Sequence, residues 1–224
     1  MSEDTRCQGH GWGDFIEGEI YADAQAPWRD DPAFPLLLEL PGLRESVGGR
    51  IAAALTQAAG LVQAFARIDL LEVIHASRPV RGLCLGFGMN VLEPYDLLKV
   101  FTLDQVHAYE WIGEHVAEAA QTLQALRSED PLLPSRIRLY HGTISDLGAV
   151  ADGAIRVVYT ANVFHPEVPM SPQTFAAAVG EMVRVLGTGG VVLSRGSAGV
   201  LEAELTRSSR MLLQTPLVSV FQKR

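Results

Sequence analysis

Two glycines and a glutamate have the spacing of a nucleotide or nucleoside pocket. Gly86 and Gly88 follow the short apolar run Leu83–Leu85, and glycine lets the backbone turn sharply and approach a ligand closely. Glu110 comes about twenty residues later and closes the next apolar segment, where a carboxylate would accept hydrogen bonds from ribose hydroxyls. We therefore predict that these three residues line one pocket.

A histidine further along the chain could act as a general base. His165 follows a predicted strand, and open α/β sheets bind their ligands at the carboxyl ends of the strands. An imidazole at that place could deprotonate a hydroxyl or an amine. The alternative is a loop histidine whose ring is hydrogen-bonded to a backbone carbonyl, and the sequence leaves both interpretations open.

The overall composition excludes some classes of function. The chain has 224 residues, of which 48% are hydrophobic and 20% are charged, which suits one globular domain with a full core. Its formal net charge is -8, and an acidic chain lacks the basic surface that most nucleic-acid-binding proteins need. We therefore expect a small-molecule substrate and no nucleic acid.

The sequence also indicates where the protein works. Residues 1–4 are not a basic region followed by an apolar segment, which is the pattern of a secretory signal. The apolar stretch 51–74 is interrupted by charged and amide side chains, so it predicts an amphipathic helix and no membrane span. Cys7 and Cys84 give no disulfide pattern, and Cys7 with His10 lacks the further ligands of a zinc site. We expect a cytoplasmic protein without a metal.

The elements that would position the pocket alternate between strands and helices. We predict a leading helix over residues 50–76, which should end before Pro79 because proline disfavours a helical residue in front of it. We then predict strands near 81–86, 105–110, 137–141, 154–159 and 190–194, one or two strands after 208 with the last at 217–222, and helices near 94–100, 113–127, 171–187 and 198–208. This alternation predicts a doubly wound, mainly parallel α/β sheet.

Residues 1–49 have a different composition from the rest of the chain. They are rich in Gly, Pro, Asp and Glu, but their aromatic residues are too numerous for a disordered tail. We predict that they form either a lid over the pocket or a docking segment for a second copy or another protein. The chain would then consist of an extension, 1–49, and one domain, 50–224.

From residue 80 onward the chain resembles the class I S-adenosylmethionine-dependent methyltransferases, which are Rossmann-like. Residues 152–165, Asp-Gly-Ala-Ile-Arg-Val-Val-Tyr-Thr-Ala-Asn-Val-Phe-His, resemble the fourth strand of that family and the loop after it. Residues 175–194, ending in Glu-Met-Val-Arg-Val-Leu-Gly-Thr-Gly-Gly-Val-Val-Leu-Ser, are the most specific match, and 217–224 resemble the closing strand. The resemblance implies seven strands, with one antiparallel strand near the edge.

The resemblance also implies a cofactor, S-adenosylmethionine, and a place for it. Gly86 and Gly88 would lie beside its methionine and ribose parts, and Glu110 would bind the ribose hydroxyls. Trp111 would lie against the adenine, although it could equally pack between the sheet and a helix.

Three further residues enter the predicted site through the resemblance. Thr143 and Ile144 match the residues that flank the adenine ring after the third strand, and Asn162 matches the wall that faces the methyl group. The function implied is methyl transfer to a small-molecule acceptor, with His165 as the candidate base.

The chain departs from the family's pattern at four positions. Cys84 stands where a carboxylate is usual, and Asn90 stands where a third glycine is usual. Thr143 and Arg156 each replace a frequent aspartate. These departures support an alternative function, a methyltransferase-like binding or scaffold protein without catalysis. A nicotinamide-dependent oxidoreductase is a third hypothesis, which the match over 175–194 disfavours.

Overall fold

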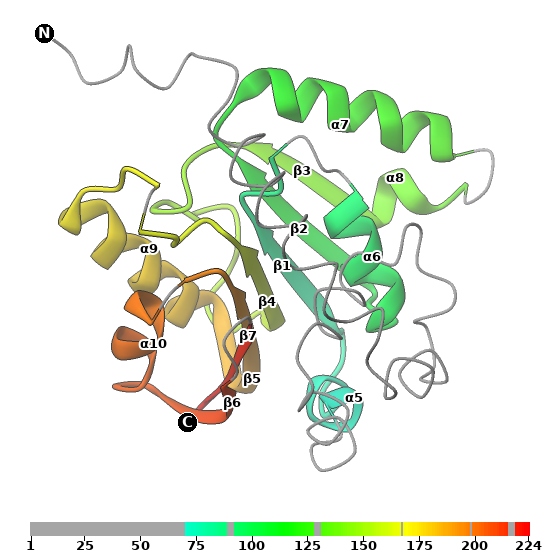
Figure 1. Ribbon diagram of the computed structural model, residues 1–224. Coiled ribbons are helices and arrows are strands. Elements are labelled where there is room, and N and C mark those ends of the chain that lie inside the picture. Colours follow the sequence, from blue (N-terminus) through cyan, green and yellow to red (C-terminus); the bar gives the residue numbers. More distant parts are fainter. Residues whose placement is uncertain (1–69, 89–91, 128–130, 167, 198, 215–217) are drawn as a thin grey trace, which may run out of the picture.

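The computed structural model describes residues 70–224 except 89–91, 128–130, 167, 198 and 215–217 (Figure 1). The predicted extension 1–49 and the departure at Asn90 therefore lie outside the described residues. Of the predicted leading helix 50–76, the described part is its last turn, helix α5, Leu70–Ile74.

Seven strands form one sheet, as predicted. They are β1 Arg81–Leu85, β2 Gln105–Glu110, β3 Ile137–His141, β4 Ile155–Ala161, β5 Leu186–Arg195, β6 Ser209–Gln214 and β7 Val218–Lys223. Their order is β3-β2-β1-β4-β5-β7-β6. Strands β1 to β5 pair in parallel, whereas β7 runs antiparallel to both β5 and β6. The predicted antiparallel strand next to the edge is therefore β7.

Helices cover both faces of this sheet. They are α6 Leu92–Val100, α7 Gly113–Leu126, α8 Leu133–Arg136, α9 Pro172–Val185 and α10 Val200–Leu205. Figure 1 shows α6, α7 and α8 on one side of the sheet and α9 and α10 on the other. Because both faces are covered, β4 is buried along its whole length, as expected of an internal parallel strand.

The two faces hold separate apolar clusters. The cluster under α6 and α7 includes Phe87, Leu97, Leu98, Phe101 and Leu123. The cluster under α9 and α10 includes Met182, Val185, Leu201, Leu205 and Phe221. Successive side chains of a strand point to opposite faces, so a residue's position in a strand decides which cluster it joins.

Some predicted boundaries are wrong, for local reasons. Helix α6 begins at Leu92, so Pro94 is not its first residue. Helix α9 ends at Val185 and strand β5 begins directly at Leu186, so Gly187 lies in a strand and does not end the helix. A Cβ at Gly187 would lie 2.8 Å from the carbonyl oxygen of Gly153. The glycine therefore permits a close approach of two backbones.

Arg156, one of the four departures, has a structural role. It lies near the amino end of β4, and its buried guanidinium donates to the carbonyls of Val73 (2.9 Å), Ile74 (3.3 Å) and Thr188 (2.8 Å). The side chain thus ties the end of α5 to the sheet. Since ligands of such sheets bind at the carboxyl ends of the strands, this departure does not affect the predicted site.

Candidate functional site

The carboxyl ends of β1, β2, β3 and β4 meet at one edge of the sheet. The backbone N–H of Gly86, after β1, donates to the carbonyl of Tyr109 at 2.8 Å, and the N–H of Gly142, after β3, donates to the carbonyl of Glu110 at 3.0 Å. Val163, after β4, packs against Gly86. The structure therefore brings together loops that are far apart in the sequence.

The predicted glycine bend is present after β1. Gly86 and Gly88 have φ values of 63° and 55°, a region that favours glycine. A Cβ at Gly86 would lie only 2.4 Å from Cγ2 of Val163. Phe87, between the two glycines, is fully buried and anchors the bend in the core. The geometry of the bend was thus predictable, and its role in binding a ligand stays a prediction.

Glu110 lies directly beside this bend. Its side chain is 3% exposed, and its Oε2 accepts the N–H of Gly88 at 2.9 Å while its Oε1 accepts the N–H of Ile112 at 3.0 Å. Nδ1 of His115 lies 4.0 Å from Oε1. Each carboxylate oxygen has about two lone pairs, so each can still accept a bond from a ligand hydroxyl. The two backbone bonds hold the carboxylate in one orientation.

Trp111 follows Glu110 and presents an open aromatic surface. Its side chain is 56% exposed, which does not fit the alternative of packing between the sheet and a helix. The carbonyl of Trp111 accepts a hydrogen bond from Nε2 of His141 at 3.0 Å. The absence of a side chain at Gly113 leaves room for this imidazole. His141 and His115 support the site from neighbouring elements, and the sequence analysis missed both.

The loop after β3 contains the next two predicted residues. Thr143 Oγ1 lies 2.8 Å from Oγ of Ser145 and accepts the N–H of Ser145 at 3.2 Å. Both bonds of the threonine hydroxyl therefore lie within its own turn. When this hydroxyl donates to Oγ of Ser145, it keeps at most one lone pair that could accept a hydrogen bond from a ligand amine. Ile144 is partly buried and packs on the cluster under α9.

Asn162, at the end of β4, has an uncommon backbone conformation and a buried side chain without hydrogen bonds. Its φ is 59°, which is uncommon for a residue other than glycine. Its side chain is 6% exposed, and among the described residues neither amide atom has a hydrogen-bond partner. An unsatisfied buried group costs about 1–3 kcal/mol, and such costs gather at functional sites.

His165 is held near Asn162 by a turn. Its backbone N–H donates to the carbonyl of Asn162 at 3.1 Å, and its own carbonyl accepts the N–H of Val168 at 2.9 Å. Phe164 anchors the turn by an edge-to-face contact with Phe175, with ring centroids 5.7 Å apart. The half-buried His165 therefore lies at the carboxyl end of β4, as predicted, and its role as a base stays a prediction.

Cys84, the departure in β1, is an inert thiol. It is fully buried, and burial together with the nearby carboxylates of Glu93 and Glu110 raises its pKa well above the usual value. Glu93, on α6, is itself 1% exposed. The chain thus places a buried carboxylate near the position where the family usually has one, but from a helix. The sequence analysis missed this residue.

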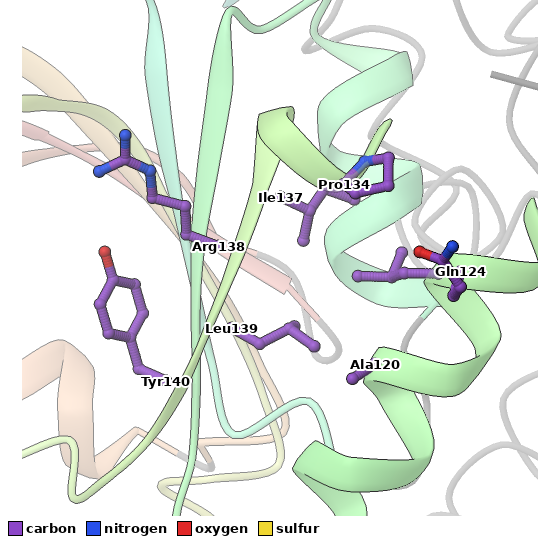
Figure 2. A pocket seen from close by; sticks show the side chains of 8 residues that line it. Ala120, Gln124, Pro134, Ile137, Arg138, Leu139 and Tyr140 are labelled. Carbon is purple, nitrogen blue, oxygen red and sulfur yellow. The ribbon is translucent and has the colours of Figure 1, made fainter. Parts of the chain in front are cut away.

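A groove of about 450 Å³ lies apart from these residues. Figure 2 shows it between α7, α8 and β3, with Arg138 and Tyr140 extending to the other side of the strand. Its lining residues are Ala120, Leu123, Gln124, Pro134, Ile137, Arg138, Leu139 and Tyr140. The groove is mainly apolar and contains no carboxylate or histidine, so we do not assign the candidate site to it.

Metal-binding clusters and membrane-spanning helices are both absent from the described ranges. Residues 70–224, with the gaps given above, contain no group of three or more His, Cys, Asp and Glu side chains that could bind a metal ion. In the same part of the chain no helix has the length and apolar character needed to cross a membrane. Cys7 and His10 lie outside the described residues.

Solved structures share this fold. The N-methyltransferase NodS from Bradyrhizobium japonicum WM9 matches with a TM-score of 0.52 and 14% identity, over 72% of this chain and 96% of that chain. A methyltransferase from Geobacter sulfurreducens matches with a TM-score of 0.49 and 14% identity, over 69% and 77%. A putative sarcosine dimethylglycine methyltransferase from Galdieria sulphuraria matches with a TM-score of 0.45 and 17% identity, over 59% and 44%.

The match thus spans less than half of the Galdieria protein. Neither a family model nor a curated protein matches the sequence. The chain has the fold of the class I S-adenosylmethionine-dependent methyltransferases. Identity this low establishes the fold and leaves the chemistry to be argued from the site.

Proposed function

We propose that the protein transfers a methyl group from S-adenosylmethionine to a small-molecule acceptor. The observation that carries this proposal is the carboxylate of Glu110. It is buried at the end of β2, held by two backbone N–H groups, and keeps a free lone pair on each oxygen beside the glycine bend. This is the arrangement that binds the two vicinal hydroxyls of a ribose.

The residues around Glu110 suit the rest of the cofactor. The exposed indole of Trp111 and the side chain of Ile144 would contact the purine, and the hydroxyl of Thr143 could accept a bond from its amino group. Gly86 would let the methionine part pass close to the backbone. When bound, S-adenosylmethionine supplies an activated methyl group that a nucleophile displaces.

The chain's own contribution would be orientation and the removal of a proton. Asn162 and His165 lie at the end of β4, so both would face the acceptor. A firmly held turn fixes their positions, and correct positioning of reacting groups accounts for a large part of the rate of such reactions. His165 would accept a proton from the hydroxyl or amine that attacks the methyl group.

Calorimetry with S-adenosylhomocysteine tests the cofactor site. We expect saturable micromolar binding that Glu110→Gln weakens by at least about tenfold, since a charge-assisted hydrogen bond contributes roughly 1.5–3 kcal/mol. Glu114→Gln is the matched control, because Glu114 is an exposed carboxylate in the first turn of α7. No binding at millimolar ligand, or equal effects of the two substitutions, would contradict the proposal.

The second candidate function is a binding or scaffold protein with this fold and no catalysis. Two observations favour it. The buried Cys84 thiol stands where the family usually has a carboxylate, and its pKa is raised. The hydroxyl of Thr143 is already hydrogen-bonded to Ser145 within its own turn. It predicts a folded protein that does not bind S-adenosylhomocysteine and that engages a partner through residues 1–49. Calorimetry as above, together with partner binding by chains with and without residues 1–49, separates it from the enzyme.

A further inference from the structure

A buried polar cluster lies at the carboxyl end of β5. Oε1 of Glu202, on α10, accepts hydrogen bonds from the hydroxyls of Ser197 and of Ser219, the latter at 2.8 Å. The hydroxyl of Ser194 donates to Ser197 at 3.1 Å. All four residues are less than 10% exposed. The cluster therefore occupies the interior, where polar groups normally have partners.

Several atoms of this region lack such partners. Among the described residues, Oε2 of Glu202, Oγ1 of Thr160 and both amide atoms of Asn162 are buried without a hydrogen bond. A buried carboxylate oxygen without a partner is costly. Because three side chains share this property, one ligand could satisfy all of them.

The sheet connects the three residues through their neighbours. The register pairs Thr160 of β4 with Ser194 of β5, and Ser194 with Ser219 of β7, so their side chains project to the same face. Asn162 lies against Gly196, since a Cβ there would be 2.1 Å from its Oδ1. Ser197, which binds Glu202, is the next residue.

The buried atoms without a hydrogen-bond partner indicate which kind of ligand could bind here. Oε2 of Glu202 and Oδ1 of Asn162 accept hydrogen bonds, so they require a donor. A carboxylate forms its strongest hydrogen bonds with a cationic donor, more so at a buried place. Arg195 does not supply this cation from the same side, because it alternates with Ser194 along β5 and projects to the opposite face.

We propose that Glu202, Asn162 and Thr160 form the acceptor subsite and that the acceptor is a small amine. This inference rests on the proposed function and specifies its substrate class. The ammonium or amine group would lie between Oε2 of Glu202 and Oδ1 of Asn162, while Ser197 and Ser219 hold the carboxylate through its other oxygen. His165, on the same turn as Asn162, would accept a proton from the ammonium, and the lone pair freed in this way would attack the methyl carbon as its bond to the cofactor sulfur breaks.

The test uses the full chain and pairs of primary amines and alcohols with the same carbon skeleton, such as benzylamine and benzyl alcohol. With S-adenosylhomocysteine present, amines should raise the thermal midpoint more than their alcohols. With S-adenosylmethionine, amines should be the substrates. Glu202→Gln should lower kcat/KM for amines roughly 10- to 100-fold, as expected for a lost charge-assisted bond, without changing the Kd of S-adenosylhomocysteine.

Glu204→Gln is the matched control, because Glu204 lies on the same helix and pairs with the exposed Arg207. Thr160→Val, which keeps the side-chain shape, provides a second test if Glu202→Gln does not fold. Use of alcohols in place of amines, no response to any amine, or an unchanged kcat/KM in Glu202→Gln would overturn the inference. Failure to bind S-adenosylhomocysteine overturns the proposed function, whereas an amine-dependent midpoint shift that Glu202→Gln abolishes would still support the subsite.

Discussion

Gly86 combines a left-handed backbone with a contact that excludes any side chain. Its φ is 63°, and a Cβ would lie 2.4 Å from Val163. Gly86→Ala should therefore lower the free energy of unfolding by about 1–3 kcal/mol, measured in urea. Gly180 is a matched control on the exposed side of α9 with open space around it. Gly180→Ala should raise stability by about 0.5–1 kcal/mol, and similar losses in both variants would contradict the argument.

The buried side chain of His107 should make the stability of the folded protein depend on pH. Burial, with smaller contributions from Arg138 and Arg81, lowers the pKa of His107 to about 4. Because this is below the unfolded value of 6.5, the unfolded chain binds the proton more tightly. The stability that neutral His107 gives above pH 6.5 is lost as the pH falls toward 4, by up to about 3 kcal/mol.

The variant His107→Gln isolates this effect from the titration of carboxylates. Both proteins should lose stability on acidification, but the wild type should lose more between pH 6.5 and 4. Denaturant unfolding at several pH values measures the difference. Parallel pH profiles for the two proteins would show that His107 titrates normally in the folded state.

At the scale of elements, the start of α9 was predictable and can be tested. Ser171 Oγ accepts the N–H of Thr174 at 3.1 Å, and Pro172 occupies the first helical position. Ser171→Ala should cost about 1 kcal/mol because the cap is lost. Ser171→Asp should stay within about 0.5 kcal/mol of the wild type, since aspartate also caps helices. Thermal or urea unfolding distinguishes these outcomes, and equal losses would show that the cap has no role.

Other elements depend on contacts that the sequence does not reveal. The segment at Leu133–Arg136 is a short helix, α8, in a stretch to which we assigned no helix or strand from the sequence. Its Leu133 is buried in the cluster under α7, so tertiary packing stabilises a turn that is too short to form alone. Arg156 is a similar case, because its carbonyl partners come from α5 and β5.

At the scale of the whole molecule, charge is distributed very unevenly. Residues 1–49 contain ten of the 26 acidic residues and three of the 18 basic residues. The remaining chain is nearly neutral. We propose that this acidic, aromatic-rich extension is a lid, because a cover that excludes water would favour methyl transfer.

Deletion of residues 1–49 tests the lid. The shortened chain should keep its far-ultraviolet circular dichroism and bind S-adenosylhomocysteine within about tenfold of the full chain, because Glu110 and its partners remain. Turnover of any acceptor should fall much further. Full turnover with loss of dimerisation or of a protein partner would instead identify a docking segment, as measured by light scattering and partner capture.

Local patterns in the sequence predicted most of the elements and the residues of the proposed cofactor site. Residues 105–110 and 137–141 are strands with the predicted bounds, because a short segment whose apolar residues are continuous or alternate with polar ones favours a strand by itself. Gly86, Gly88 and Glu110 were recognisable for the same reason, since each stands at the end of such a run. The alternation of elements predicted the mainly parallel sheet, and the resemblance to the methyltransferases implied its seven strands.

Only the tertiary structure added Thr160 and Glu202 to the proposed acceptor subsite. Thr160 and Asn162 lie two residues apart at the end of β4, whereas Glu202 lies on α10, and the spacing between these two segments carries no recognisable pattern. The fold brings these segments into one region, because β4, β5 and β7 are neighbours in the sheet and Glu202 of α10 binds Ser219 of β7. Whether a buried polar atom has a partner depends on what surrounds it in space, so the sequence could single out Asn162 by resemblance but could not show that Asn162, Thr160 and Glu202 carry unsatisfied atoms.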